Sequence, residues 1–437
     1  MLIVEEVDAL VLRGARIIDP AEGVDRRGDI AVDRGVLVVE PPAGAVELDA
    51  SAWIVCPGLL DIHVHLREPG QSHKETIETG TGAATAGGFT FVACMPNTNP
   101  PLDDPATLAF VLREARRVGH CAVGPVAAIT RGRHGRQLCD FPALRDAGAV
   151  AFSDDGTGVE DDAVMLDAFR TASELDVLLI QHCEYRSLSA GGVMHLGEIS
   201  RRLSVPGLDP RSEEAMIERD IDLCRRTGGR YHVAHISTAL AVDLVRRARA
   251  EGLPVTAEVC THHLMLTHEA CGDLDPNTKM HPPLRTQEDV DACRRGLLDG
   301  TIDCVVSDHA PHTVEEKSAG FLAAPPGIVG LETALGVTAA AMIDTGLADW
   351  ASVLRWFTCG PAGVLKRPVP RLSPGLPADL TMIHPTCRWT VEPQHFVSLG
   401  RNTPFGGWTL PSKAIGTLRG RVFRRLAETG GENPSLR

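Results

Sequence analysis

The sequence from residue 53 to residue 70 reads WIVCPGLLDIHVHLREPG, an apolar run that ends in two histidines, His63 and His65. On an extended strand, residues i and i+2 point to the same side. Both imidazoles can therefore bind one metal ion from the end of a single strand. Arg67 continues the same alternation, where it can meet an anionic substrate beside that ion. The stretch predicts a buried strand that carries chemistry at its carboxyl end.

Seven further apolar runs follow this one, each short and each ended by a polar or glycine-rich turn. Such runs are typical of parallel strands that helices cover on both faces. The eight runs lie at residues 54–63, 89–95, 121–129, 149–153, 177–181, 231–236, 254–259 and 302–307, and amphipathic stretches between them include residues 105–118, 162–175, 212–227 and 240–251. This alternation predicts a (β/α)₈ barrel, and a doubly wound open sheet is the alternative.

The two ends of the chain do not alternate in this way. Short strand-like segments separated by turns lie at residues 9–12, 29–32, 35–39 and 45–48, and again at 378–383, 389–391 and 418–423. Two such regions can pair into one small β-sandwich outside the barrel. We therefore expect residues 54–369 to form the barrel, and residues 1–53 and 370–437 to form the composite sandwich and a polar tail.

The composition excludes several classes of protein. The chain has 437 residues and a net charge of −14, and 43% of its residues are hydrophobic, which suits a globular protein and argues against a nucleic-acid surface. No apolar stretch reaches the roughly 18 residues of a membrane span, and no signal peptide is apparent. The twelve cysteines form no C-x-x-C pair, which argues against a zinc finger and a disulfide framework. A cytoplasmic location is expected.

Polar residues follow five of the predicted strands. In a barrel the carboxyl ends of all strands face one mouth, where active sites lie. Imidazole and carboxylate ligands without thiolates suit zinc or a similar first-row ion. Six ligands are too many for one catalytic zinc, but they fit two ions that share a bridging carboxylate and a bridging hydroxide. Such a hydroxide can attack an amide-like carbon. The candidates are His63, His65, Asp154 or Asp155, His182, His235 and Asp308.

Longer motifs stand in order around these residues. They are HxHxREPG from His63, MPNT from Met95, AFSDDG from Ala151, QHCE from Gln181, AHIST from Ala234, AEVCTHH from Ala257, KMHPPLR from Lys279, SDHAPH from Ser307 and NTPFGGW from Asn402. Together they resemble the amidohydrolase superfamily and, within it, the class I dihydroorotases. The resemblance extends over residues 8–423.

The resemblance implies a role for each candidate ligand. His63 and His65 would bind one zinc with Asp308, His182 and His235 would bind a second zinc, and Asp155 would bridge the two. A hydroxide between the ions would be the nucleophile, with Asp308 as general acid and base. The implied reaction is the reversible hydrolysis of dihydroorotate to N-carbamoyl-L-aspartate in pyrimidine biosynthesis.

Other residues are predicted to recognise the substrate carboxylate and ring. Arg67 can supply a bidentate guanidinium fork and Asn97 two amide donors. The resemblance adds His65, His281, His312, Pro326 and Gly327 to this wall. His281 departs from the family, because many members have Asn at that position of the K-x-N-P-P-L-R segment. The long connection at residues 310–326 is a candidate lid.

Two other functions remain open at this stage. One is another cyclic amidohydrolase of the allantoinase or hydantoinase type, but many of those relatives bridge their metals with a carboxylated lysine on strand four. This chain has no lysine between Lys74 and Lys279, so that bridge cannot come from strands two to six. The other is a non-catalytic scaffold homologue that pairs with aspartate transcarbamoylase. A homodimer and a transcarbamoylase complex are both expected by family analogy only.

Overall fold

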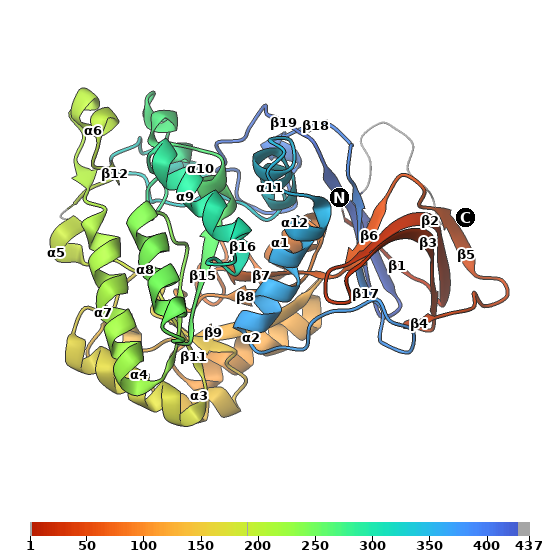
Figure 1. The fold of residues 1–437 in the computed structure, drawn as a ribbon, viewed down its shortest axis with the longest axis horizontal. Coiled ribbons are helices and arrows are strands. Elements are labelled where there is room, and N and C mark those ends of the chain that lie inside the picture. The colour runs from red at the N-terminus through yellow and green to blue at the C-terminus, as the bar shows by residue number, and fades with distance from the viewer. Residues whose placement is uncertain (1, 190, 427–437) are drawn as a thin grey trace.

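A computed structural model describes residues 2–189 and 191–426 of the chain. Its central feature is a barrel of eight parallel strands, which lies in the half of the molecule that helices surround (Figure 1). The strands follow one another around the barrel in chain order. They are β7 (Leu59–Val64), β8 (Phe89–Cys94), β9 (Ala122–Ala127), β10 (Ala151–Phe152), β11 (Leu178–Gln181), β14 (Arg230–Val233), β15 (Val255–Cys260) and β16 (Cys304–Val306).

The first and last strands meet at the seam of the barrel. The His65 amide donates to the carbonyl of His309 at 2.9 Å, and the Ser307 amide donates to Asp61 Oδ2 at 3.0 Å. These contacts bring the carboxyl ends of β7 and β16 side by side. The predicted (β/α)₈ barrel is confirmed, and all eight strands point their carboxyl ends at one mouth.

Helices cover the outside of the barrel, and their start signals lie in the sequence. Asp104 and Asp161 cap the helices that follow them, and their carboxylates accept from backbone amides of the first turn. The predicted helix at 105–118 is observed with these bounds, as is that at 162–175. The helices are α1 (Ile77–Ala86), α2 (Pro105–Val118), α3 (Phe141–Asp146), α4 (Asp162–Leu175), α7 (Arg211–Thr227), α8 (Ala239–Ala250), α9 (Gln287–Leu298), α11 (Ala334–Met342), α12 (Trp350–Phe357) and α13 (Cys359–Val364).

A nine-stranded sheet built from both ends of the chain lies beside the barrel (Figure 1). Its own apolar core combines Leu10 and Leu12 from the N-terminal segment with Leu380 and Phe423 from the C-terminal one. Its strands are β1 (Leu2–Glu6), β2 (Ala9–Asp19), β3 (Val24–Asp33), β4 (Val36–Val38), β5 (Val46–Asp49), β6 (Ile54–Pro57), β17 (Asp379–His384), β20 (Lys413–Arg419) and β21 (Val422–Leu426). The composite terminal β-structure is thereby confirmed, whereas the boundaries at residues 53 and 369 remain predictions. The predicted tail lies outside the described residues.

Two predicted strands are interrupted by turns. The run at 54–63 divides at Gly58 into β6, which joins the terminal sheet, and β7, which enters the barrel. A side chain at Gly58 would collide with Thr90 and Asp379, so glycine permits this close crossing. The predicted strand at 418–423 is wrong, because Gly420, with φ of 60°, turns the chain between β20 and β21.

The strand predicted at 389–391 does not join the terminal sheet, because it pairs with residues 409–410 in a separate two-stranded sheet. It is one of several small elements that lie within the loops. They are α5 (Arg186–Ser189), α6 (Glu198–Leu203), α10 (Val314–Lys317), β12 (Met194–His195), β13 (Gly207–Leu208), β18 (Trp389–Thr390) and β19 (Thr409–Leu410). All twelve cysteines are free thiols. Within residues 2–189 and 191–426, none of the helices has the length and apolar character needed to cross a membrane.

Candidate metal centre

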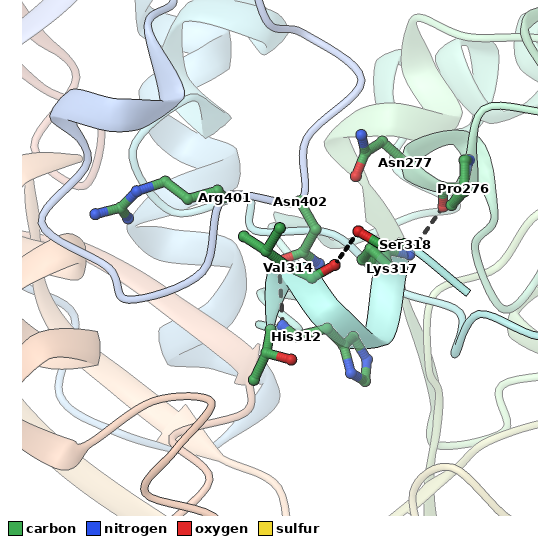
Figure 2. Close-up of a pocket in the computed structure, with 9 residues that line it drawn as sticks. Pro276, Asn277, His312, Val314, Lys317, Ser318, Arg401 and Asn402 are labelled. Atoms are coloured by element: carbon green, nitrogen blue, oxygen red, sulfur yellow. Dashed lines mark hydrogen bonds between the residues drawn. The ribbon is translucent and has the colours of Figure 1, made fainter. Parts of the chain in front are cut away.

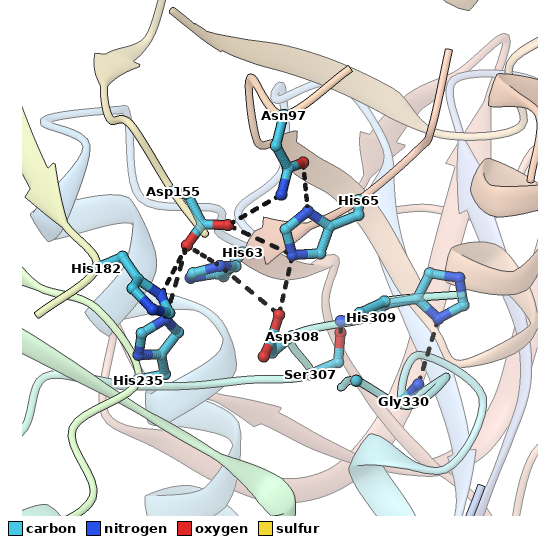
Figure 3. A network of polar contacts seen from close by, with 12 residues as sticks. His63, His65, Asn97, Asp155, His182, His235, Ser307, Asp308, His309 and Gly330 are labelled. Carbon is cyan, nitrogen blue, oxygen red and sulfur yellow. Dashed lines mark hydrogen bonds and ion pairs between the residues drawn. The ribbon is translucent and has the colours of Figure 1, made fainter. Parts of the chain in front are cut away.

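Asp155 lies at the centre of a group of histidines that come from three strands (Figure 3). Its Oδ1 is 3.2 Å from His63 Nε2, 3.6 Å from His182 Nδ1 and 3.6 Å from His235 Nε2. His63 ends β7, and the other residues follow β10, β11 and β14 within three positions of the strand end. One carboxylate oxygen thus faces three imidazole nitrogens from separate parts of the sequence.

His65 and Asp308 form the other side of the group. His65 Nε2 lies 3.1 Å from Asp308 Oδ1 and 3.6 Å from Asp155 Oδ2. His63 Nε2 lies 3.7 Å from Asp308 Oδ1. Asp155 therefore faces both halves of the group with its two oxygens, as a bridging ligand must.

The two neighbouring aspartates have different surroundings. Asp154 Oδ1 accepts from the amides of Ile129 and Thr130 at 2.8 and 3.0 Å, and its Oδ2 accepts from the Thr130 hydroxyl. Asp154 is therefore hydrogen-bonded to the turn that follows β9, while Asp155 is directed at the histidines. The structure brings together all six of His63, His65, Asp155, His182, His235 and Asp308, and leaves Asp154 outside the group.

The donor atoms of this group fit a cation. His63 Nε2 and Asp155 Oδ1 are buried, and neither has a hydrogen-bond partner in the part of the chain that the structure describes. Buried polar atoms are normally paired. Two unpaired donor atoms that face each other therefore indicate a cation that both would bind. Nitrogen and carboxylate oxygen donors suit zinc and similar ions. The sets His63/Asp155/His235 and His63/His65/Asp308 each lie close enough to hold a metal ion.

Acceptors behind two histidines direct their lone pairs toward the centre. His63 Nδ1 binds the carboxylate of Glu258, and His65 Nδ1 lies 2.8 Å from Asn97 Oδ1. An acceptor at Nδ1 keeps the proton there and frees Nε2 to bind a metal ion. Glu258 Oε1 also accepts from the His235 amide at 3.2 Å.

The electrostatics keep both central carboxylates charged. Burial works to raise the pKa of Asp155, but His63 and the contacts with His182 and His235 bring that pKa well below its ordinary value. Burial likewise opposes ionisation of Asp308, but the contact with His65 and the neighbouring His63 lower its pKa nevertheless. Anionic carboxylates beside imidazoles are the form that binds cations.

The group opens into a cavity of about 420 Å³. All of the predicted substrate contacts line it: His65, Arg67, Asn97, His281, His312, Pro326 and Gly327. Arg67 is 7% exposed, and it donates from Nε to the carbonyl of Pro311 at 3.2 Å. Burial lowers the pKa of Arg67 to about 10, against the opposing charges of Asp308 and Asp155. It thus remains a cation at neutral pH.

A second cavity of about 340 Å³ shares His312 with the first (Figure 2). The residues that line it include Lys317, whose Nζ donates to the carbonyls of Pro276 and Pro325 at 2.9 Å. None of the candidate metal ligands lines this cavity. We therefore assign the chemistry to the first cavity, and residues of the candidate lid help to line the second.

Three residues of the site were not singled out from the sequence. Glu258 backs His63, Glu184 lies 3.6 Å from His182, and Arg133 donates to the Asp155 carbonyl at 2.6 Å. Glu184 belongs to the QHCE motif and Glu258 to AEVCTHH, so both lie in motifs that the sequence analysis had already identified. Nothing in the spacing says which histidine each carboxylate faces. Arg133 carries no such signal.

Three site residues have a strained backbone. Arg67, His235 and Asp308 have φ values of 63°, 34° and 46°. A left-handed φ is uncommon for non-glycine residues and occurs most often at functional sites. Each such residue costs roughly 1–3 kcal/mol, which the interactions of the surrounding structure offset. The strain redirects these side chains where a strand gives way to its loop.

Known proteins of one family match the chain along nearly its whole length. A family model described as "Dihydro-orotase-like" matches residues 52–240. A dihydroorotase from Syntrophus aciditrophicus is 43% identical over 420 residues, which are 94% of this chain and 98% of that protein. A dihydroorotase from Pelotomaculum thermopropionicum is 46% identical over 415 residues, with 94% and 97% covered.

Solved structures share the fold at lower identity. An L-hydantoinase from Arthrobacter aurescens superposes with a TM-score of 0.83 at 22% identity, covering 95% of each chain. A dihydropyrimidinase from Brevibacillus agri gives a TM-score of 0.82 at 21% identity, covering 95% of this chain and 94% of that one. These structures support the architecture alone. The sequence relatives identify the lineage, and the chain belongs to the dihydroorotase family.

Proposed function

We propose that this protein is a dihydroorotase, which hydrolyses dihydroorotate reversibly to N-carbamoyl-L-aspartate. The observation that carries the proposal is the convergence of four imidazoles and two carboxylates on a cavity that also contains a buried arginine. The relatives that bear the name dihydroorotase cover nearly the whole chain. The biosynthetic direction is ring closure.

The six ligands divide into two sets that share Asp155. His63, His65 and Asp308 would hold one ion, and His182 and His235 the other, with zinc as the metal and two ions per subunit. When bound, such ions lower the pKa of a water molecule and polarise an amide oxygen. The unpaired Nε2 of His63 and Oδ1 of Asp155 support a bound cation at this group.

The protein's own groups orient the substrate and move the proton. Arg67 would bind the ring carboxylate as a bidentate donor, Asn97 and His312 would border the same wall, and the other predicted contacts would border the ring. As water attacks the ring carbonyl, Asp308 would take its proton. Asp308 would then deliver that proton to the departing nitrogen as the C–N bond of the ring amide breaks. Asp308 suits this task because it lines the cavity and is held anionic by His65.

The test is an activity assay before and after chelation. Purified protein should cyclise carbamoyl-aspartate, lose this activity on removal of its metal, and recover it when zinc is restored. The assay should be repeated with allantoin and hydantoin, because hydantoinases share the fold. Faster turnover of either compound than of dihydroorotate would contradict the proposed substrate, and activity that persists without any metal would contradict the proposed centre.

The proposed setting follows from the same family. We expect a cytoplasmic enzyme of pyrimidine biosynthesis that forms a homodimer and associates with aspartate transcarbamoylase. Sedimentation of the purified chain, alone and with the transcarbamoylase, tests both associations. A monomer that sediments unchanged in the mixture would exclude them.

A further inference from the structure

His182 has separate partners at its two ring nitrogens. Nδ1 lies 2.9 Å from His235 Nε2 and 3.6 Å from Asp155 Oδ1, so this nitrogen faces the centre of the group. Nε2 lies 3.6 Å from Glu184 Oε2. A histidine can offer a lone pair at Nδ1 only while its proton stays on Nε2. The carboxylate of Glu184 is placed to favour that tautomer.

Glu184 is itself held by a second histidine. His281 Nε2 lies 2.8 Å from Glu184 Oε2, and the His281 ring stacks on that of His182 with centroids 5.0 Å apart and planes 24° apart. The Glu184 side chain is 11% exposed, while the His281 side chain keeps 29% of its surface exposed at the cavity. His281 therefore contacts both the carboxylate and the imidazole that the carboxylate faces.

The segment that carries His281 is fixed at both ends. Lys279 Nζ donates to the carbonyls of Leu322 and Ala324 at 2.9 and 2.7 Å. At the other end, Arg285 is 1% exposed and donates to Glu213 Oε2 and Ser237 Oγ, both at 2.9 Å. These anchors tie the segment to the candidate lid and to the turn that follows His235. They fix the position of His281 beside the candidate metal ligands.

We infer that Glu184 is a positioning residue for His182, and that His281 holds Glu184 in place. In this arrangement the proton of His182 Nε2 points at Glu184, and the Nδ1 lone pair points at the proposed second ion. Carboxylates that back a metal-binding histidine are worth about 10–100-fold in metal affinity. The inference rests on the proposed two-ion site and adds a residue that controls one half of it. His281, at the position where many family members have Asn, then affects metal binding as well as the substrate.

The experiment measures metal binding without substrate. Metal-free protein is titrated with Zn²⁺ against a chromophoric chelator, for the wild type, Glu184→Gln, Glu184→Ala and His281→Asn. We expect the wild type to bind two ions, and Glu184→Gln to bind the second of them about 10–100-fold more weakly with the first unchanged. Glu184→Ala should be at least as weak as Glu184→Gln, and His281→Asn should fall between Glu184→Gln and the wild type.

A neighbouring carboxylate serves as the matched control. Glu160 accepts at 3.2 Å from the amide of Arg186, a residue that lines the cavity. Among the described residues no histidine forms a hydrogen bond or ion pair with its carboxylate, so Glu160→Gln should bind both ions like the wild type. Two ions of unchanged affinity in Glu184→Gln would overturn this inference alone. A third ion that disappears in Glu184→Gln would make Glu184 a ligand and would also overturn it. A wild type that binds no metal would sink the proposed function itself.

Discussion

The two halves of the candidate metal centre are supported from different parts of the molecule. His63 is fully buried, and Glu258, which binds its Nδ1, is fully buried as well. On the other half, His182 faces Glu184 and His281, which line the cavity. The first half is thus supported from inside the barrel and the second mainly from the cavity side, although Glu258 also accepts from the His235 amide at 3.2 Å. Loops vary more readily than cores, so we expect substitutions to be tolerated better around the second half than around the first.

The largest expected effect comes from removing the carboxylate that joins the halves. Asp155→Asn should weaken binding of both ions by more than about 100-fold and should abolish turnover. Removing a residue that only hydrogen-bonds to a metal ligand typically costs about 10–100-fold. Asp154→Asn is the matched variant, because Asp154 binds Thr130 instead. It should lose about 1–3 kcal/mol of unfolding free energy and keep its metal. Metal content and thermal unfolding of both variants distinguish them, and equal metal loss would contradict the assignment of Asp155.

The next effect tests the proton transfer proposed for the first half. Asp308→Asn should lower kcat by about 10²–10⁴-fold, the usual contribution of a general acid and base. Its metal content should stay close to that of the wild type, because the amide oxygen can still bind a metal ion and His63 and His65 remain. Steady-state kinetics with metal analysis provide the measurement. Undiminished turnover would show that another group moves the proton.

A smaller effect should follow when the support inside the barrel is weakened. Glu258→Gln removes the charge behind His63, and we expect the first ion to bind about 10–100-fold more weakly with the second little changed. This is the mirror image of Glu184→Gln. Glu75→Gln is the control, since Glu75 is equally buried and contacts His309 at 3.2 Å, which is no candidate ligand. If Glu258→Gln weakened both ions equally, the two halves would not be independent.

What could be read from the sequence depended on whether the information was local. Helices α2 and α4 were predicted with their observed bounds from the amphipathic pattern within each segment, and the structure adds a capping aspartate directly before each of them. The histidine pair on β7 was predicted from strand periodicity alone. Glu258 was missed because it contacts His63 from β15, 195 residues further along the chain, and no sequence spacing specifies that contact. Asp154 and Asp155 could not be separated by periodicity, since their orientation is set by the turn after Phe152.

The smallest expected effect concerns the most variable part of the second half. His281→Asn restores the residue common in the family, and the shorter amide can still donate toward the cavity. We expect KM for dihydroorotate to change by about 2–10-fold, the worth of one hydrogen bond of 0.5–1.5 kcal/mol, while kcat measured at saturating zinc changes less. Saturating zinc removes the contribution of weaker metal binding, so the remaining change reports contact with the ring. A complete loss of activity under those conditions would mean that His281 is part of the core chemistry, and the division into a fixed inner half and a variable outer half would fail.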